Sequence, residues 1–117
     1  MQVPPYKTRS FVCLDKALRK MLNTLCLRDW QVTLTVGSAA PEGFASNDAE
    51  GGGCCLYNID YLTADIWIDP FACKRVDSDP LWILGHEVGH IWINVIMNEE
   101  IKCSLIGTLL HGRLSNG

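Results

Sequence analysis

The chain has 117 residues, enough for a single domain with one modest hydrophobic core. Its formal net charge is −3, with 10 basic against 13 acidic residues, so no basic surface favours a nucleic-acid partner. The chain does not begin with a basic and apolar leader, and no apolar run reaches the length of a membrane span. We therefore expect a cytoplasmic domain without a membrane partner.

Six cysteines are spread along the chain without any C-x-x-C pair, which argues against a zinc ribbon and a thioredoxin motif. In a reducing cytoplasm a free cysteine behaves as a small hydrophobic residue. We therefore expect free thiols, and the alternative is a disulfide-rich secreted domain. The six are Cys13, Cys26, Cys54, Cys55, Cys73 and Cys103.

The first expected element is an amphipathic helix from Ser10, as its N-cap, to about Leu27. Residues 1–8 contain proline and polar side chains, and we expect them to be loose. Apolar residues at spacings of three and four define the buried face of the helix: Phe11, Leu14, Leu18, Leu22 and Leu25. A weak basic cluster off this stripe is expected to be a solvated helix face, with a binding patch as the alternative: Lys16, Arg19 and Lys20.

Residues 30–36 alternate strictly between apolar and polar, which predicts a half-buried strand. Its core side would be formed by Trp30, Val32, Leu34 and Val36. The stretch 37–53 is rich in glycine and small polar residues, and we expect a loop, alone or with a short strand near Phe44. Loops of this length are often functional or disordered, but this one lacks a phosphate-binding glycine motif.

Two further strands, 54–58 and 63–69, are expected to form a hairpin. Alternation in the second strand would put three apolar residues on one face: Ala64, Ile66 and Ile68. Pro70 would end that strand, because proline cannot donate a backbone hydrogen bond to a sheet. Residues 71–78 would then connect the hairpin to the next helix.

A strongly apolar helix would follow, with Asp79 as its N-cap and Pro80 at its first position. It would run to about Met97, and the segment 98–100 would make a break before a short final helix at 101–110. Apolar residues go nearly all the way round the first of these helices. This pattern predicts that the helix is buried.

That helix carries His86-Glu87-x-x-His90, a match to the pattern H-E-x-x-H. Residues four apart lie one above the other on the same face of a helix, so both imidazoles can bind one Zn²⁺ ion. Glu87 follows His86 directly and is too close along the backbone to be a comfortable third ligand. It is suited instead to take a proton from a zinc-bound water.

The motif resembles that of the zincin metallopeptidases, and the order of the expected elements is similar to a minimal zincin catalytic half. The resemblance implies an α+β fold with an N-terminal helix, a small twisted three-stranded sheet, the HExxH active-site helix and a short C-terminal helix. It covers about residues 11–110 of a single domain, 1–117, in which the tail, 112–117, is expected to be frayed.

Two groups of zincins are the most similar. Short phage and prophage metallopeptidase-like proteins have a comparable strand, here 29–32 with the sequence D-W-Q-V, and a comparable hairpin end, here 66–69 with the sequence I-W-I-D. ImmA/IrrE-type repressor-cleaving peptidases have a similar H-E-x-G-H, followed by a glutamate that opens the next helix. Only the HExxH part of either resemblance is a sharp motif.

Catalytic zinc usually has three protein ligands, so a third ligand is needed. On a continuous helix Glu99 and Glu100 would lie about 15 Å along the axis from the metal, out of reach. They can serve only if the helix ends near Met97 and the chain folds back. The ImmA-type resemblance implies Glu100, and then Glu99, as this ligand; the alternative role is a carboxylate at the N-terminus of the last helix.

His111 is the only other histidine, and as a zinc ligand it would resemble the arrangement of SprT-type peptidases. We rank it after Glu100 because it lies beside Gly112 in the tail that is expected to be frayed. Asp69 and Asp65 rank below both.

With a third ligand, the expected activity is zinc-dependent hydrolysis of a protein or peptide substrate, with Glu87 as general base and then proton shuttle. Tyr57, Tyr61 and His111 are equivalent candidates for a donor to the scissile carbonyl. By the resemblance, the strand 63–69 would be the edge that pairs with an extended peptide. The alternative function is a catalytically inactive zinc-binding module of zincin fold that binds a partner. The oligomeric state stays open.

Overall fold

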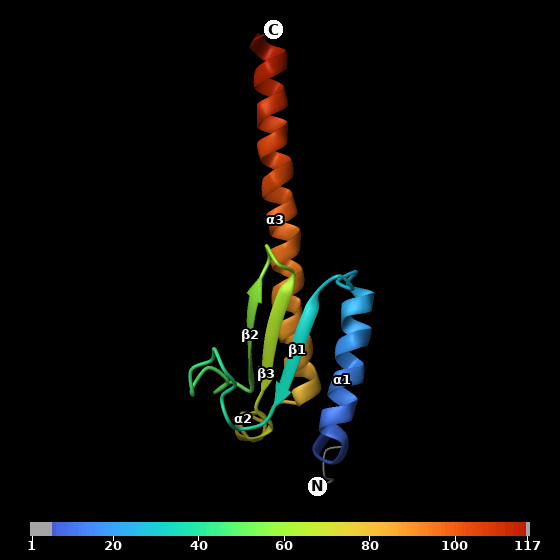
Figure 1. Cartoon of the computed structure of the whole chain (residues 1–117), viewed down its shortest axis with the longest axis vertical. Helices are drawn as coiled ribbons and strands as arrows, with labels where there is room; N and C mark the ends of the chain where they lie inside the picture. The colour runs from blue at the N-terminus through green and yellow to red at the C-terminus, as the bar shows by residue number, and fades with distance from the viewer. Residues whose placement is uncertain (1–5, 117) are drawn as a thin grey trace.

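Three helices and one three-stranded sheet make up the chain in the computed structural model, which describes the backbone of residues 6–116 and the side chains of residues 14–100 and 102–112 (Figure 1). This arrangement confirms the expected α+β class. In chain order the elements are α1 (Tyr6–Thr24), β1 (Gln31–Val36), β2 (Gly53–Asn58), β3 (Thr63–Ile68), α2 (Pro70–Arg75) and α3 (Pro80–Asn116).

The sheet is mixed and has the strand order β1-β3-β2. β1 runs parallel to β3, with Gln31 opposite Thr63, and β2 runs antiparallel to β3, with Cys55 opposite Ile66. β3 is therefore the central strand, and the expectation that it is the free edge is wrong. The physical reason is its burial: Ile66, Trp67 and Ile68 are all buried, as is typical of a strand covered on both faces.

The hydrophobic core lies between the sheet and the two long helices, α1 and α3, which cover the same face of the sheet (Figure 1). Its buried members come from all three elements: Leu14 and Leu18 of α1, Ala64, Ile66 and Ile68 of β3, and Ile83, Leu84, Val88 and Ile91 of α3. The predicted inner faces of α1 and β3 are confirmed where their side chains are described; Phe11 lies outside that range.

The opposite face of β3 is closed by the long loop between β1 and β2. Phe44 packs its ring edge-on against Trp67, with 5.7 Å between ring centroids. The indole Nε1 of Trp67 also donates to the carbonyl oxygen of Gly37 at 2.8 Å. The loop 37–52 is thus confirmed, and it contains no strand near Phe44.

β2 is held close to α3 because it begins with a glycine. A Cβ atom on Gly53 would lie 2.6 Å from Cγ2 of Ile83 and 2.9 Å from Cδ1 of Ile68. Real Cβ atoms do not approach so closely, so only glycine lets the strand and the helix come together here. This contact fixes β2 beside the first turns of α3.

The first helix differs from the expectation at both ends. It begins at Tyr6, so Ser10 lies inside the helix and is not its N-cap. It ends at Thr24, because Cys26 takes a left-handed conformation (φ 58°) and the N–H of Leu27 donates to the carbonyl oxygen of Leu22 at 2.7 Å. This is a Schellman ending, in which a non-glycine residue occupies the left-handed position.

The expected connector 71–78 contains a short helix, α2. The carboxylate of Asp69 accepts hydrogen bonds from the N–H groups of Phe71 (3.0 Å) and Ala72 (3.2 Å). Pro70 occupies the first helical position. Asp69 and Pro70 therefore begin a helix, in addition to ending the strand as expected.

α3 begins as expected and does not end as expected. Oδ1 of Asp79 accepts from the N–H of Leu81 at 2.9 Å, which confirms the N-cap. The helix then continues without interruption to Asn116, so the break expected at 98–100 is wrong. The segment 98–100 has no proline or glycine, and glutamate is a good helix former.

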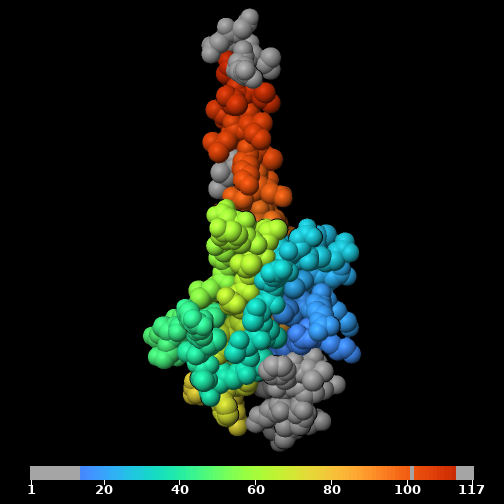
Figure 2. Space-filling model, viewed as in Figure 1, coloured from blue at the N-terminus to red at the C-terminus, as the bar shows by residue number. Residues whose placement is uncertain are grey.

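The second half of α3, residues 98–116, extends well past the sheet as a free-standing arm (Figures 1 and 2). The whole molecule measures 70 × 28 × 24 Å. Within the described part of the chain, no helix has the length together with the apolar character needed to cross a membrane.

The expectation that the motif helix is buried all round is wrong. One side of α3 packs in the core, whereas Trp82, Ile93 and Met97 on another side are exposed. The apolar residues exceed what one sheet and one neighbouring helix can cover. α3 thus presents apolar surface to the outside along much of its length.

The described cysteine side chains form no disulfide, as expected: Cys26, Cys54, Cys55, Cys73 and Cys103 are free. Cys73 is buried, and its Sγ contacts the carbonyl oxygen of Gly52 at 3.4 Å. It therefore behaves as a small core residue.

Candidate metal centre

His86 and His90 lie one turn apart on an exposed side of α3 and point their rings at each other. Their Nε2 atoms are 3.2 Å apart, their ring centroids are 4.8 Å apart and their planes are nearly perpendicular, at 86°. Two nitrogen ligands of one tetrahedral Zn²⁺ ion, each about 2.0–2.1 Å from it, lie about 3.4 Å apart. The pair therefore fits a shared zinc ion, as the four-residue spacing predicts.

Two neighbouring side chains on α3 contact the motif histidines, one at a ring and one at the backbone. The indole ring of Trp82 stacks on the imidazole of His86, with 5.4 Å between centroids and 23° between planes. Nδ2 of Asn94 donates to the backbone oxygen of His90 at 2.7 Å. Sequence reasoning missed both residues, although each lies four positions from a motif histidine and so must share its side of the helix.

Glu87 lies on the inner side of α3 and is only 7 % exposed. Burial raises the pKa of its carboxyl group, and the positive charge of His86 and of His90 opposes that rise. The carboxyl group is thus close enough to both histidines to be affected by their charge. A carboxyl group with a raised pKa is typical of one that exchanges protons during catalysis.

On the sheet side, two thiols of β2, those of Cys54 and Cys55, lie close enough to Glu87 to be affected by its charge. Burial, and then the charge of Glu87, raise the pKa of Cys55 to about 12. The pKa of Cys54 is raised by burial and by the charges of Asp48 and Glu87. Both thiols therefore stay protonated near neutral pH.

Within the part of the chain whose side chains are described, no third ligand joins the histidine pair. Among the described residues, no three His, Cys, Asp or Glu side chains are grouped so that they can hold a metal ion. Because α3 is continuous, Glu100 and Glu99 lie about 15 Å along its axis from His90, and His111 about 31 Å. The condition under which either glutamate can serve, a helix end near Met97, is not met.

The two aspartates that ranked lower lie elsewhere. Asp69 is buried, and its carboxylate caps α2. Asp65 is exposed on β3, and the alternation of that strand puts it on the face opposite Ala64 and Ile66, away from α3.

The two tyrosines considered as carbonyl donors differ in position. Tyr57 of β2 pairs with Ala64, so it shares the sheet face that turns to α3 and is 41 % exposed there. β2 and α3 run in the same direction (Figure 1), and Tyr57 comes two residues, about 7 Å, beyond Cys55. Tyr61 lies in the turn of the hairpin and is largely exposed. Tyr57 is therefore the better candidate.

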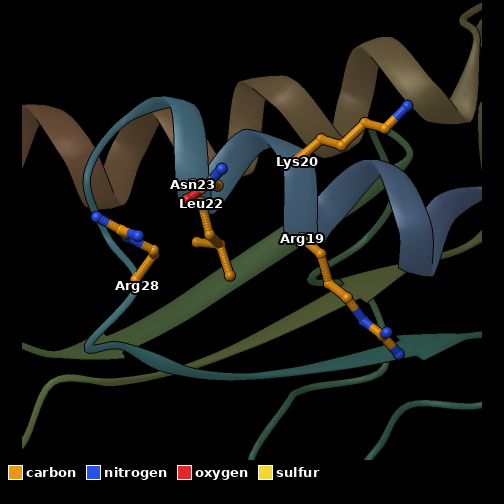
Figure 3. Close-up of a pocket in the computed structure, with 5 residues that line it drawn as sticks. All are labelled: Arg19, Lys20, Leu22, Asn23 and Arg28. Carbon is orange, nitrogen blue, oxygen red and sulfur yellow. The ribbon is translucent and has the colours of Figure 1, made fainter.

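A hollow of about 490 Å³ lies at α1 and the turn after it, on other elements than the motif (Figure 3). Its lining includes Arg19, Lys20 and Arg28, whose side chains point in different directions. Arg19 is already paired with Asp15 at 2.7 Å. The arrangement lacks the convergent donors of an anion site and agrees with a solvated helix face.

Comparison with protein-family models, with curated proteins and with solved structures gives no match to this chain. The class of the protein therefore rests on its fold and on the histidine pair. These define an α+β domain with an exposed His-His pair and a buried glutamate on one helix.

Proposed function

We propose that this chain is a zinc-dependent peptidase built on a minimal zincin-like fold. The observation that carries the proposal is the 3.2 Å separation of the two Nε2 atoms, with the buried carboxyl group of Glu87 on the adjoining side of the same helix. A purely structural histidine pair needs no carboxyl group beside it. The burial of Glu87 has a cost in solvation, and a role in proton transfer explains why it is there.

In this proposal His86 and His90 hold the zinc ion, and the indole of Trp82 keeps the ring of His86 in its orientation. When bound, zinc polarises a carbonyl group and acidifies a water molecule. Glu87 accepts a proton and returns it to the leaving amine. Its raised pKa suits this double role, because both protonation states are then accessible nearer to neutral pH.

The substrate would be an extended peptide that pairs with the free edge of β2. This edge, and not β3, is available, because β3 is already paired on both sides. β2 is also packed against the first turns of α3, so a peptide on its outer edge would pass near the histidine pair. Tyr57 would donate to the scissile carbonyl group.

The test is a comparison of zinc content and hydrolysis in the parent chain and in Glu87→Gln, with Glu99→Gln as the matched control on the exposed arm. We expect Glu87→Gln to keep its zinc and to lose at least about a hundredfold in the rate of hydrolysis of an unfolded protein substrate. Glu99→Gln should behave as the parent chain. Full activity of Glu87→Gln would remove this residue from the mechanism.

A second function, a zinc-binding module without turnover, is favoured by one observation: a single chain brings only two ligands together in the described residues. A histidine pair alone binds zinc weakly and leaves the metal open to partner ligands. This function predicts that His86→Ala abolishes zinc binding and that no substrate is hydrolysed by the parent chain under any condition.

A further inference from the structure

The exposed side of α3 around the histidine pair is apolar. Trp82 is 64 % exposed and Ile93 is 51 % exposed. Trp82 lies four residues before His86, on which its ring stacks, and Ile93 lies three residues after His90. Residues three or four apart share one side of a helix, so both apolar side chains flank the histidines along the axis.

This surface also lacks charge. From Leu81 to Asn98, a stretch described throughout, Glu87 is the only Asp, Glu, Lys or Arg residue of α3, and it is buried. The solvated face of a helix ordinarily carries charged and polar residues. An uncharged apolar surface beside the histidines fits an apolar ligand and disfavours a charged one, because a charge placed on it would lose solvation without gaining a partner.

The same side of α3 lies next to β2. A Cβ atom on Gly53 would touch Ile83, so the start of β2 is level with Ile83, and His90 follows Ile83 by two helical turns on nearly the same side. β2 and α3 run in the same direction (Figure 1). Cys55, about 7 Å beyond Gly53, is then level with Glu87, about 6 Å beyond Ile83. The effect of the Glu87 charge on the Cys55 thiol agrees with this register.

We propose that a peptide paired with the outer edge of β2 places alternate side chains on this apolar surface, and that Trp82 and Ile93 select apolar residues on the two sides of the cleaved bond. The inference rests on the proposed peptidase function and deepens it. It names the substrate class: extended segments in which apolar side chains flank the scissile bond.

The spacing along the helix sets which substrate positions are selected. Trp82 lies about 9 Å before the midpoint of the two histidines, and Ile93 lies about 7.5 Å after it. An extended peptide advances about 3.3 Å per residue, so each apolar contact falls about two to three residues from the scissile bond. Substrate side chains that share the sheet face of Cys55 and Tyr57 point to α3. Burying one such leucine strengthens binding by about tenfold or more.

The experiment measures peptide binding to the zinc-free chain, because loss of Trp82 is also expected to weaken zinc binding. Two short fluorescein-labelled peptides carry either leucine or serine at the second and third positions on each side of the central bond. By fluorescence anisotropy the leucine peptide should bind the parent chain at least about tenfold more tightly. Trp82→Ala and Ile93→Ser should each reduce this preference by about tenfold. Equal binding of the two peptides to the parent chain, or no binding of either, overturns the inference.

The matched control is Trp92→Ala. Trp92 is another partly exposed tryptophan of α3, but it lies two residues from His90 and thus on the opposite side of the helix. This variant should keep the full preference for the leucine peptide. A loss as large as that in Trp82→Ala overturns the assignment of the preference to the histidine side. Circular dichroism checks that α3 is intact in all three variants.

A third peptide tests the pairing with β2. It keeps the leucines, but the backbone N–H groups of one edge are methylated and cannot donate to a strand. Its affinity should fall by at least about tenfold, since main-chain hydrogen bonds provide much of the affinity when a strand is added to a sheet. Unchanged affinity overturns the inference in favour of a peptide that lies on the helix alone.

The inference and the peptidase function fail separately. If the zinc-loaded chain hydrolyses the leucine and serine peptides with the same kcat/KM, the function stands and the selection by Trp82 and Ile93 is overturned. If the zinc-free chain prefers the leucine peptide, and the preference is lost in Trp82→Ala, the apolar site stands even where the zinc-loaded chain hydrolyses neither peptide. That second result overturns only the peptidase function.

Discussion

The close contact between β2 and α3 provides a direct test of how the helix that carries His86 and His90 is positioned, through the substitution Gly53→Ala. The new methyl group would lie 2.6 Å from Cγ2 of Ile83, 2.9 Å from Cδ1 of Ile68 and 3.1 Å from the backbone oxygen of Trp67. The two side-chain ends can rotate away, but the backbone oxygen can move only with the central strand. Overpacking of this kind costs about 1–3 kcal/mol.

Gly51→Ala is the matched control, because a Cβ atom at Gly51 meets nothing within 4 Å. It should change the free energy of unfolding by less than about 0.5 kcal/mol, or stabilise slightly by restricting the unfolded chain. Urea titration followed by tryptophan fluorescence measures both variants. If Gly53→Ala unfolds within about 0.5 kcal/mol of Gly51→Ala, the strand and the helix are not packed as described.

Three further predictions follow from burial and stacking. Burial raises the pKa of Cys55 from 9.0 to about 12 in the folded state. The unfolded chain therefore loses this thiol proton first, and the free energy of unfolding falls as the pH rises through that window. In urea titrations at several pH values, Cys55→Ala should flatten this fall, and the exposed control Cys103→Ala should not. Trp82→Ala should weaken zinc binding by about tenfold in competition with a chelating dye, while Trp92→Ala leaves it unchanged; equal values would exclude the stacking role. Ile91→Ala, at a fully buried position, should cost about 2–5 kcal/mol in chemical unfolding, whereas Ile106→Ala, at 57 % exposure, should cost less than about 0.5; similar losses would place the arm in the core.

The elements that the sequence predicts well are those with a local cause. The strict alternation of residues 30–36 produces β1, and Asp79 with Pro80 begins α3, because each pattern acts through neighbouring residues. The histidine pair belongs to the same group. His86 and His90 converge because the α-helical period alone puts positions four apart on one side.

The features that the sequence did not predict have causes elsewhere in the fold. The parallel pairing of β1 with β3 joins segments about 30 residues apart and makes β3 the central strand, so no local pattern could indicate which edge stays free. α2 was missed because Pro70 is compatible with both the end of a strand and the first turn of a helix. Only the carboxylate of Asp69, bonded to the N–H of Phe71 and of Ala72, decides between them.

The apolar residues of α3 form two groups, one facing the core and one facing outward, and the sequence pattern alone does not separate them. Residues such as Leu84 and Ile91 follow the helical period and face the core of their own chain. Ile93 and Met97 lie four residues apart on another side of the helix and face outward. Read together, the two stripes look like a helix that is apolar all round and therefore buried.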